Sequence, residues 1–157
     1  MVAGTGWLPV DLPAGMGSVV GIGVDAVEVD RLRTVLARRP GMARRLFTPG
    51  EHDYARRASD PTPRMATRFA AKEATMKALG VGLGSVRFDE VEVVRLGLDA
   101  PTLVLHGSAA ERSRRAGVVR WHLSLTHTDS MAMAFVVAEG AFVVAEGGDP
   151  VPPSATS

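Results

Sequence analysis

Two acidic residues in separate parts of the chain could hold a divalent metal ion together. Asp25 follows a stretch of alternating glycine and aliphatic residues, and Glu73 lies in an Ala-rich segment. That segment also contains both lysines of the chain, Lys72 and Lys77. Carboxylates suit Mg²⁺, which takes few protein ligands and keeps several waters, and ammonium groups suit phosphates. These residue types predict a site for a metal-bound phosphate, provided that the fold brings the two carboxylates together.

A third candidate for chemistry is the segment Ser124-Leu-Thr-His127, at the end of a predicted strand. A histidine there could bind a phosphate or carry a proton, because its ordinary pKa lies near neutral pH. Ser124 with His127 also suggests a hydrolase, but no nucleophile elbow surrounds the serine. Each residue has a structural interpretation too. A lone histidine is more often structural, Asp25 could cap or turn the chain, and Glu73 with Lys77 could be a surface helix pair.

The composition predicts a single domain with its own core. The chain has 157 residues, 46% of them hydrophobic and 22% charged, and it contains no cysteine. Disulfides and thiolate chemistry are therefore excluded, and we expect a cytoplasmic location. No apolar run approaches the roughly 20 residues that cross a bilayer. Residues 1–17 lack the pattern of a signal peptide, so we expect no membrane association.

Charge is nearly balanced overall but unevenly placed. The net charge is +1 and only 5% of the residues are aromatic, which argues against a nucleic-acid binder. Six arginines nevertheless fall between Arg31 and Arg45. A local basic patch of this kind predicts an acidic partner or a phosphate-bearing ligand.

The candidate residues lie on elements that the residue pattern predicts. Residues 19–24 alternate as a strand, and the glycines on one face would admit another backbone or a ligand beside Asp25. The third glycine of a dinucleotide fingerprint is missing. Residues 68–80 predict an Ala-rich helix that is closed by its final glycine.

The remaining elements predict the fold class. An amphipathic helix over residues 27–39 ends at Pro40, and the capping box Thr48-Pro-Gly-Glu51 starts a second, short helix. A further helix is expected over residues 108–116, and strands over 91–96, 102–105, 119–126 and 131–138. Strands linked this closely predict an α+β fold, an antiparallel sheet packed with helices on one side.

A seven-residue segment near the C-terminus is duplicated. Residues 134–140, Ala-Phe-Val-Val-Ala-Glu-Gly, recur without change as residues 141–147. We expect the first copy to form the last strand, because it continues the alternation that begins at Met131. A register shift onto the second copy is the alternative. We therefore predict a leader over residues 1–17, one domain over 18–140 and a tail over 141–157.

Four ordered motifs resemble those of the holo-acyl-carrier-protein synthases, the small 4′-phosphopantetheinyl transferases. They are Gly21-Ile-Gly-Val-Asp25 with Glu28 and Arg31, Arg45-Leu-Phe-Thr48 with Glu51, Arg68-Phe-Ala-Ala-Lys-Glu-Ala74 with Lys77-Ala-Leu-Gly80, and Leu123-Ser-Leu-Thr-His-Thr128. The resemblance runs from about Val19 to Glu139. The turn Asp99-Ala100-Pro101 departs from the Gly-basic-Pro triplet usual there, which should alter only that turn.

The resemblance implies Mg²⁺-dependent transfer of the 4′-phosphopantetheine group from coenzyme A to a serine of an apo acyl carrier protein, with release of adenosine 3′,5′-bisphosphate. Asp25 and Glu73 match the residues that hold the metal on the pyrophosphate, and His127 completes the implied catalytic set. The implied coenzyme-binding residues are Arg68, Lys72, Lys77, Gly80, Gly82, Ser124, His127 and Thr128. The acceptor of the serine proton stays open between a metal-bound water and Glu73.

The resemblance also implies partners. Basic residues of the first helix meet the acidic recognition helix of the carrier protein in this family, which matches Arg31 and Arg45. The family assembles as a homotrimer with the coenzyme site between neighbouring subunits, so we expect no activity from a monomer. The pathway of the carrier protein (fatty-acid, polyketide or peptide) is left open.

Two other functions are alternatives to the transferase. A non-catalytic module that binds a carrier protein or coenzyme A would not require the carboxylates at positions 25 and 73, so their presence favours catalysis. A small Arg-rich nucleic-acid binder is disfavoured by the near-zero net charge and the scarcity of aromatic residues.

Overall fold

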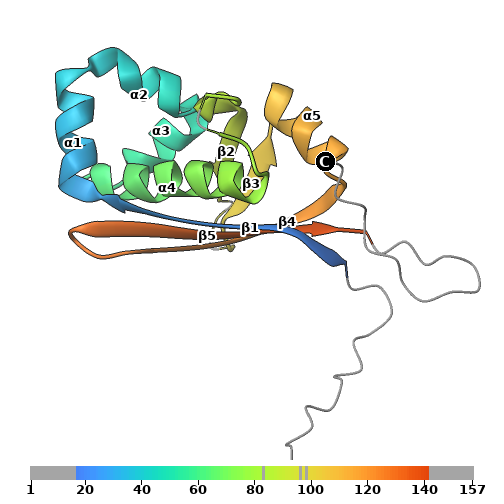
Figure 1. Ribbon diagram of the computed structural model, residues 1–157. Helices are drawn as coiled ribbons and strands as arrows, with labels where there is room; N and C mark the ends of the chain where they lie inside the picture. Colours follow the sequence, from blue (N-terminus) through green and yellow to red (C-terminus); the bar gives the residue numbers. More distant parts are fainter. Residues whose placement is uncertain (1–16, 83, 96, 98, 142–157) are drawn as a thin grey trace, which may run out of the picture.

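Three long antiparallel strands form the main sheet of the structure. β1 (Ser18–Glu28) and β4 (Val118–His127) flank β5 (Met131–Gly140), which pairs with both. In the part of the chain that the structure describes, helices lie on one face of this sheet and no element covers the other (Figure 1). The predicted α+β fold with an antiparallel sheet is confirmed. The computed structural model describes residues 17–82, 84–95, 97 and 99–141.

The remaining elements lie on or beside the helical face of the sheet. They are α1 (Val29–Arg38), α2 (Pro40–Leu46), α3 (Pro49–Ala55), α4 (Thr62–Ala78), the 3₁₀ turn Phe88–Glu90, β2 (Val91–Val94), β3 (Thr102–Leu105) and α5 (Gly107–Arg115). β2 and β3 pair with each other in a separate antiparallel ribbon. Helix α2 was not predicted. Pro40 ends the preceding helix as expected, but it also begins α2, where its missing N–H is not needed.

Helix α4 lies directly on β1 because the strand places no side chains beneath it (Figure 1). A Cβ atom at Gly21 would overlap the carbonyl oxygen of Ala78. A Cβ atom at Gly23 would overlap that of Ala74. The glycine face was predicted to admit either a backbone or a ligand, and it admits a helix backbone. The alanines of α4 continue this packing into the main core, which they share with valines of β2 and β5.

Two predicted boundaries are wrong. Residues 27 and 28 were expected to open the first helix, but they continue the strand alternation and pair with residues 132 and 131 of β5. Helix α4 begins at Thr62, well before the predicted residue 68. The carboxylate of Asp60 accepts the Thr62 amide at 2.9 Å, and a proline suits the first turn that follows.

Strand β5 contains the first copy of the duplicated segment, as predicted. A shift by seven residues would place Glu139 where Ala132 stands. The Ala132 side chain is fully buried and belongs to a cluster with Val29 and Leu32. An unpaired carboxylate there would be strongly destabilising, which explains why the first copy forms the strand.

The predicted leader, residues 1–17, and the predicted tail, residues 141–157, lie outside the described residues except for Gly17 and Ala141. Among the described helices, none is both long and apolar enough to cross a membrane.

Candidate functional site

Asp25 and Glu73, the two predicted metal ligands, come together between β1 and α4. Asp25 follows the glycines on the helix-facing side of β1, and Glu73 lies on the helix that packs there. Burial and the neighbouring Asp25 carboxyl raise the pKa of Glu73, while the charge of Lys77 lowers it. A cation shared with Asp25 would therefore stabilise the charged form of Glu73.

Lys77 joins α4 to the strand by an ion pair with Asp25. Its Nζ lies 2.8 Å from Asp25 Oδ1 and donates to the carbonyl oxygen of Val24 at 3.0 Å. The structural alternative was a surface pair of Lys77 with Glu73 along the helix, whereas this ion pair joins two elements. The Lys77 side chain is 55% exposed and that of Asp25 only 10%. The ammonium group can therefore reach a ligand while it neutralises a mostly buried carboxylate.

One oxygen of Asp25 has no hydrogen-bond partner. Among the described residues, nothing donates to Oδ2, although this atom is buried. A buried oxygen without a donor is destabilising unless a cation or water completes it. Together with Glu73 it fits Mg²⁺. The described part of the chain contains no cluster of three or more His, Cys, Asp or Glu suited to a metal, so water and ligand would supply the other oxygens.

Two hollows border this group of side chains. A cavity of about 390 Å³ is lined by Glu73, Phe69 and Arg31, together with apolar side chains of α1 and α2. A wider groove of about 1290 Å³ is lined by Lys77, Gly80 and two arginines of α5. Gly80 has the positive φ expected of the residue that ends α4. The helix face of Phe69, Glu73 and Lys77 therefore borders both hollows.

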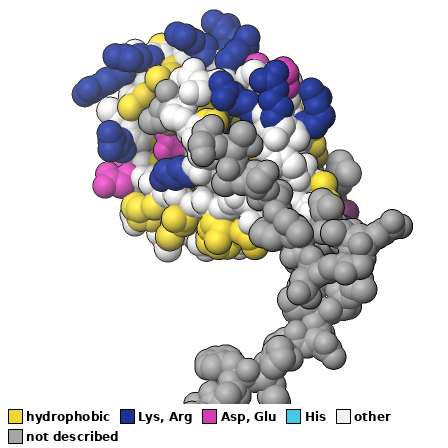
Figure 2. Space-filling view, turned by 45° about the vertical axis from the view of Figure 1, so that its right-hand side comes forward, with side chains coloured by type: hydrophobic (Ala, Val, Ile, Leu, Met, Phe, Trp, Pro, Cys, Tyr) yellow, Lys and Arg dark blue, Asp and Glu magenta, His cyan; other side chains and the backbone are white. Residues whose placement is uncertain are grey.

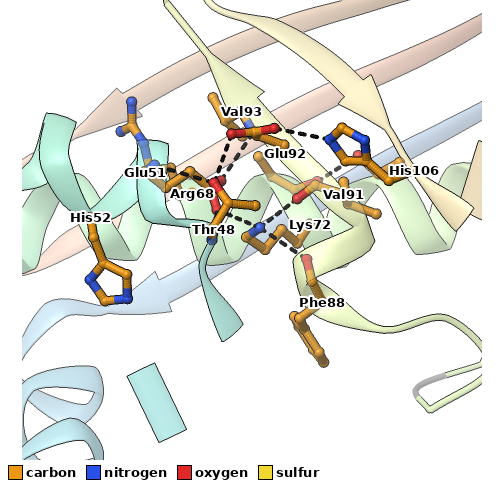
Figure 3. A network of polar contacts seen from close by, with 12 residues as sticks. Thr48, Glu51, His52, Arg68, Lys72, Phe88, Val91, Glu92, Val93 and His106 are labelled. Carbon is orange, nitrogen blue, oxygen red and sulfur yellow. Dashed lines mark hydrogen bonds and ion pairs between the residues drawn. The ribbon is translucent and has the colours of Figure 1, made fainter. Parts of the chain in front are cut away.

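Lys72 was predicted to bind the coenzyme, but it lies in the interior. Its side chain is 0% exposed. The Nζ atom lies 2.7 Å from Glu51 Oε2 and donates to the carbonyl groups of Phe88 and Val91 (Figure 3). Because an ammonium group has three donors, none is left for a ligand. The prediction for Lys72 is wrong in this structure.

Arg68 is likewise an interior residue and not a free coenzyme-binding cation. Its guanidinium lies 4.0 Å from the centre of the Tyr54 ring and donates to the Arg64 carbonyl oxygen at 3.1 Å. Burial lowers the pKa of Arg68. Positions 68 and 72 are one helical turn apart, on the face of α4 that packs against α3 and β2. The spacing did not reveal either interior position, because it does not say which face of the helix is buried.

The predicted residues Ser124, His127 and Thr128, at the end of β4, do not lie beside Asp25 of the same chain. Ser124 aligns across β5 with Val24. Since neighbouring residues of a strand point to opposite faces, this row lies on the face of the sheet away from Asp25. His127 and Thr128 are exposed at the end of β4, on the other edge of the sheet.

The predicted docking residues are exposed on the helical side of the molecule. Arg31 lies on α1 at the rim of the smaller cavity, and Arg45 lies in the last turn of α2. Figure 2 shows Lys and Arg side chains spread over this side, with hydrophobic side chains gathered along the lower edge. Gly82, also predicted to bind the coenzyme, is exposed just beyond α4.

Glu51 is a structural partner that the sequence revealed only in part. The capping box is confirmed, because Thr48 Oγ1 accepts the Glu51 amide and Glu51 Oε2 accepts the Thr48 amide. The same carboxylate also binds Lys72. No spacing signals that second contact, because it joins two helices that only the fold brings together.

Known proteins are similar to this chain over most of its length. Residues 21–136 match the family described as the 4′-phosphopantetheinyl transferase superfamily. A protein of Frankia alni named holo-[acyl-carrier-protein] synthase is 47% identical, over 78% of this chain and 98% of that protein. One of the same name from Anaeromyxobacter dehalogenans is 46% identical, with 78% and 98% covered.

Solved structures show the same fold. The holo-[acyl-carrier-protein] synthase of Neisseria meningitidis has a TM-score of 0.70 at 34% identity, with 78% of this chain and 99% of that chain covered. The synthase of Bacillus anthracis, solved in complex with CoA (3′,5′-ADP), has a TM-score of 0.64 at 33% identity, with 78% and 97% covered.

Proposed function

The chain belongs to the 4′-phosphopantetheinyl transferase superfamily, and from this premise we propose that it transfers 4′-phosphopantetheine from coenzyme A to a serine of an apo acyl carrier protein. The serine oxygen forms a bond to the phosphorus of the pantetheine phosphate and loses its proton. The pyrophosphate bond breaks, and adenosine 3′,5′-bisphosphate leaves. The observation that carries the proposal is the group of Asp25, Glu73 and Lys77 at the junction of a groove and a cavity.

Asp25 and Glu73 are the residues that would hold Mg²⁺. When bound there, the ion would neutralise the charge that gathers on the leaving bisphosphate. Lys77 adds a second positive charge from the exposed side. Glu73 is one candidate acceptor for the serine proton, since its raised pKa makes it a stronger base than an ordinary carboxylate; water is the other.

Each of the two hollows would receive one substrate, coenzyme A in the wider groove and the carrier protein at the smaller cavity. The wider groove has Lys77, the backbone of Gly80 and two arginines of α5 along its walls, which suits the phosphate-bearing nucleotide end of coenzyme A. The smaller cavity opens beside Glu73 and Arg31. Arg31 and Arg45 would meet the acidic carrier protein on that side, which would deliver its serine to Glu73.

The uncovered face of the sheet supports the expected homotrimer. Its large hydrophobic side chains include Ile22, Val24 and Phe135, exposed by 57%, 50% and 46%. An apolar surface of this kind marks an interface. If copies of the chain bury this face, Ser124 and His127 of one subunit could complete the site of its neighbour, which would explain why one chain does not assemble the whole predicted set.

Mass spectrometry of an apo acyl carrier protein tests the proposal directly. The carrier protein is incubated with coenzyme A, Mg²⁺ and this protein, and we expect its mass to increase by one phosphopantetheine group. Chelation of the metal should prevent the increase. A carrier protein that binds but gains no mass would favour the non-catalytic module instead. Sedimentation analysis of the protein alone should show a trimer.

A further inference from the structure

Lys72 and Glu51 join three elements in the interior, next to the candidate site but outside it (Figure 3). Lys72, on α4, donates to two backbone carbonyl groups at and just before the start of β2. Glu51, on α3, accepts the backbone amide of Val93 at 3.0 Å and that of Thr48 at 2.9 Å. The ion pair between them, 2.7 Å long, therefore connects α3, α4 and β2 at one point.

The other side of α4 is fixed by β1. Two alanines of the helix lie so close to Gly21 and Gly23 that no Cβ atom fits between the backbones. A helix held by a strand on one side and by a buried ion pair on the other cannot turn or slide without breaking one of these contacts. Glu73 directly follows Lys72, about 100° around the helix, so any rotation of α4 moves the Glu73 carboxyl relative to β1.

A buried ion pair fixes the relative orientation of the elements that it joins more than it stabilises the fold. Taking both charges out of water is so unfavourable that apolar side chains of similar size often hold a core equally well. Consistent with this, burial lowers the pKa of Lys72 although Glu51 opposes the shift. Hydrogen bonds to defined acceptors, by contrast, allow only one arrangement of the groups that they join. That property matters where two carboxylates must meet at a set distance.

We propose that Lys72 and Glu51 are positioning residues, whose ion pair sets the rotation of α4 so that Glu73 meets Asp25 at the spacing a shared divalent cation needs. The inference rests on the proposed function in taking these two carboxylates as the metal site. Lys72 makes no ligand contact in this account, and its effect on the reaction passes through Glu73.

The test replaces the charged pair by neutral side chains of similar size, in the double variant Lys72→Met/Glu51→Gln. Binding of Mn²⁺ is measured by electron paramagnetic resonance with coenzyme A present and no carrier protein, so that no turnover occurs. We expect Mn²⁺ affinity to fall by at least roughly tenfold, the loss typical when a group that orients a metal ligand is removed. In the complete reaction kcat should fall by a similar factor, while the KM for carrier protein stays unchanged.

Val136→Ala is the matched control for lost stability. Val136 is fully buried in the core that β5 shares with α4, and it is not among the hydrogen-bond or ion-pair partners of Lys72 and Glu51. This variant should melt at a lower temperature and still bind Mn²⁺ within about twofold of the wild type. Stability loss alone would then not explain weaker metal binding in the double variant.

Glu51→Asp keeps the charge and shortens the side chain, which covers the case of a double variant that does not fold. We expect Mn²⁺ affinity roughly fivefold below that of the wild type. With the shorter side chain, either α4 must shift toward residue 51 or the distance between the two charged groups must increase. Wild-type affinity in Glu51→Asp, or in a folded double variant, would overturn the inference. A wild-type protein that binds no Mn²⁺ with coenzyme A present would instead contradict the metal site itself.

Discussion

Two lysines of α4 each form an ion pair with a carboxylate from another element, and the two pairs lie in opposite surroundings. Lys72 and Glu51 are both fully buried, and every donor of the lysine is used. Lys77 and Asp25 pair at a similar distance, 2.8 Å against 2.7 Å, but the lysine is exposed and one carboxylate oxygen has no partner among the described residues. A pair whose donors and acceptors are all used, such as Lys72–Glu51, can only stabilise the fold. The incomplete pair, Lys77–Asp25, still has an ammonium group and a carboxylate oxygen that can bind a ligand or a metal ion.

Removal of Lys72 should have the largest effect on stability. Lys72→Met leaves the Glu51 carboxylate charged and buried, and we expect the free energy of unfolding to fall by about 3–5 kcal/mol. Denaturant unfolding measures the change. The matched variant Lys77→Met breaks an ion pair whose lysine is exposed, and should lower stability by less than Lys72→Met does. Equal losses in the two variants would remove the distinction between the pairs.

Removal of Asp25 should have the largest effect on transfer. Asp25→Ala, or Glu73→Ala, takes away half of the predicted metal site, and we expect the rate of phosphopantetheinyl transfer to fall roughly 100- to 1000-fold. Folding should be intact, because the deletion also relieves repulsion between the carboxylates. Asp53→Ala, an exposed acidic residue of α3, is the control and should keep full activity. Unimpaired turnover in either site variant would refute the metal assignment.

A variant of Arg31 tests whether the carrier protein docks beside the smaller cavity, next to the Asp25–Lys77 pair. Reversal of its charge in Arg31→Glu should raise the KM for carrier protein about tenfold and leave that for coenzyme A nearly unchanged. Arg56→Glu, another exposed arginine that lies just after α3, serves as the control. Equal effects of Arg31→Glu on the two KM values would count against a docking face at this cavity.

The pH dependence of stability should show that burial and the nearby Asp25 of the incomplete pair disfavour the charged form of Glu73. The pKa of Glu73 is raised in the folded protein, so the wild type loses stability as the pH rises from the ordinary value of 4.5 through the folded value. Glu73→Gln removes this loss. The variant should melt above the wild type near pH 7, and the difference should vanish below about pH 4. A constant difference across this range would show that Glu73 does not ionise in the way described.

Deletion of one copy of the duplicated segment should have the smallest effect. Removal of residues 134–140 or of 141–147 produces the same polypeptide, because the copies are identical. Strand β5 is then complete in either case, so we expect an unchanged melting temperature and unchanged transfer. Ala132→Glu is the contrasting variant and should unfold the protein readily. A large loss on deletion would assign the second copy a function of its own.

Local sequence patterns predicted local structure better than they predicted what each helix face contacts. The capping box at Thr48 and the left-handed glycine at position 80 are confirmed, because both depend on a few neighbouring residues. The meeting of Asp25 and Glu73 was also expected. The interior position of Lys72 was not predictable, because Glu51 and the backbone oxygens that surround it come from distant elements. Helical spacing places residues on a common face, but only packing decides what that face meets.

The bare glycine face of β1 also limits how this sequence can evolve. Every replacement of Gly21 or Gly23 adds a Cβ atom, and at both positions that atom would collide with the backbone of α4. Neutral drift in this part of the strand is thereby restricted to the alternate positions, Ile22 and Val24, whose side chains are exposed on the other face. If copies of the chain bury that face, as proposed, variation in this stretch would alter how the copies recognise each other and would leave the geometry of the carboxylates unchanged.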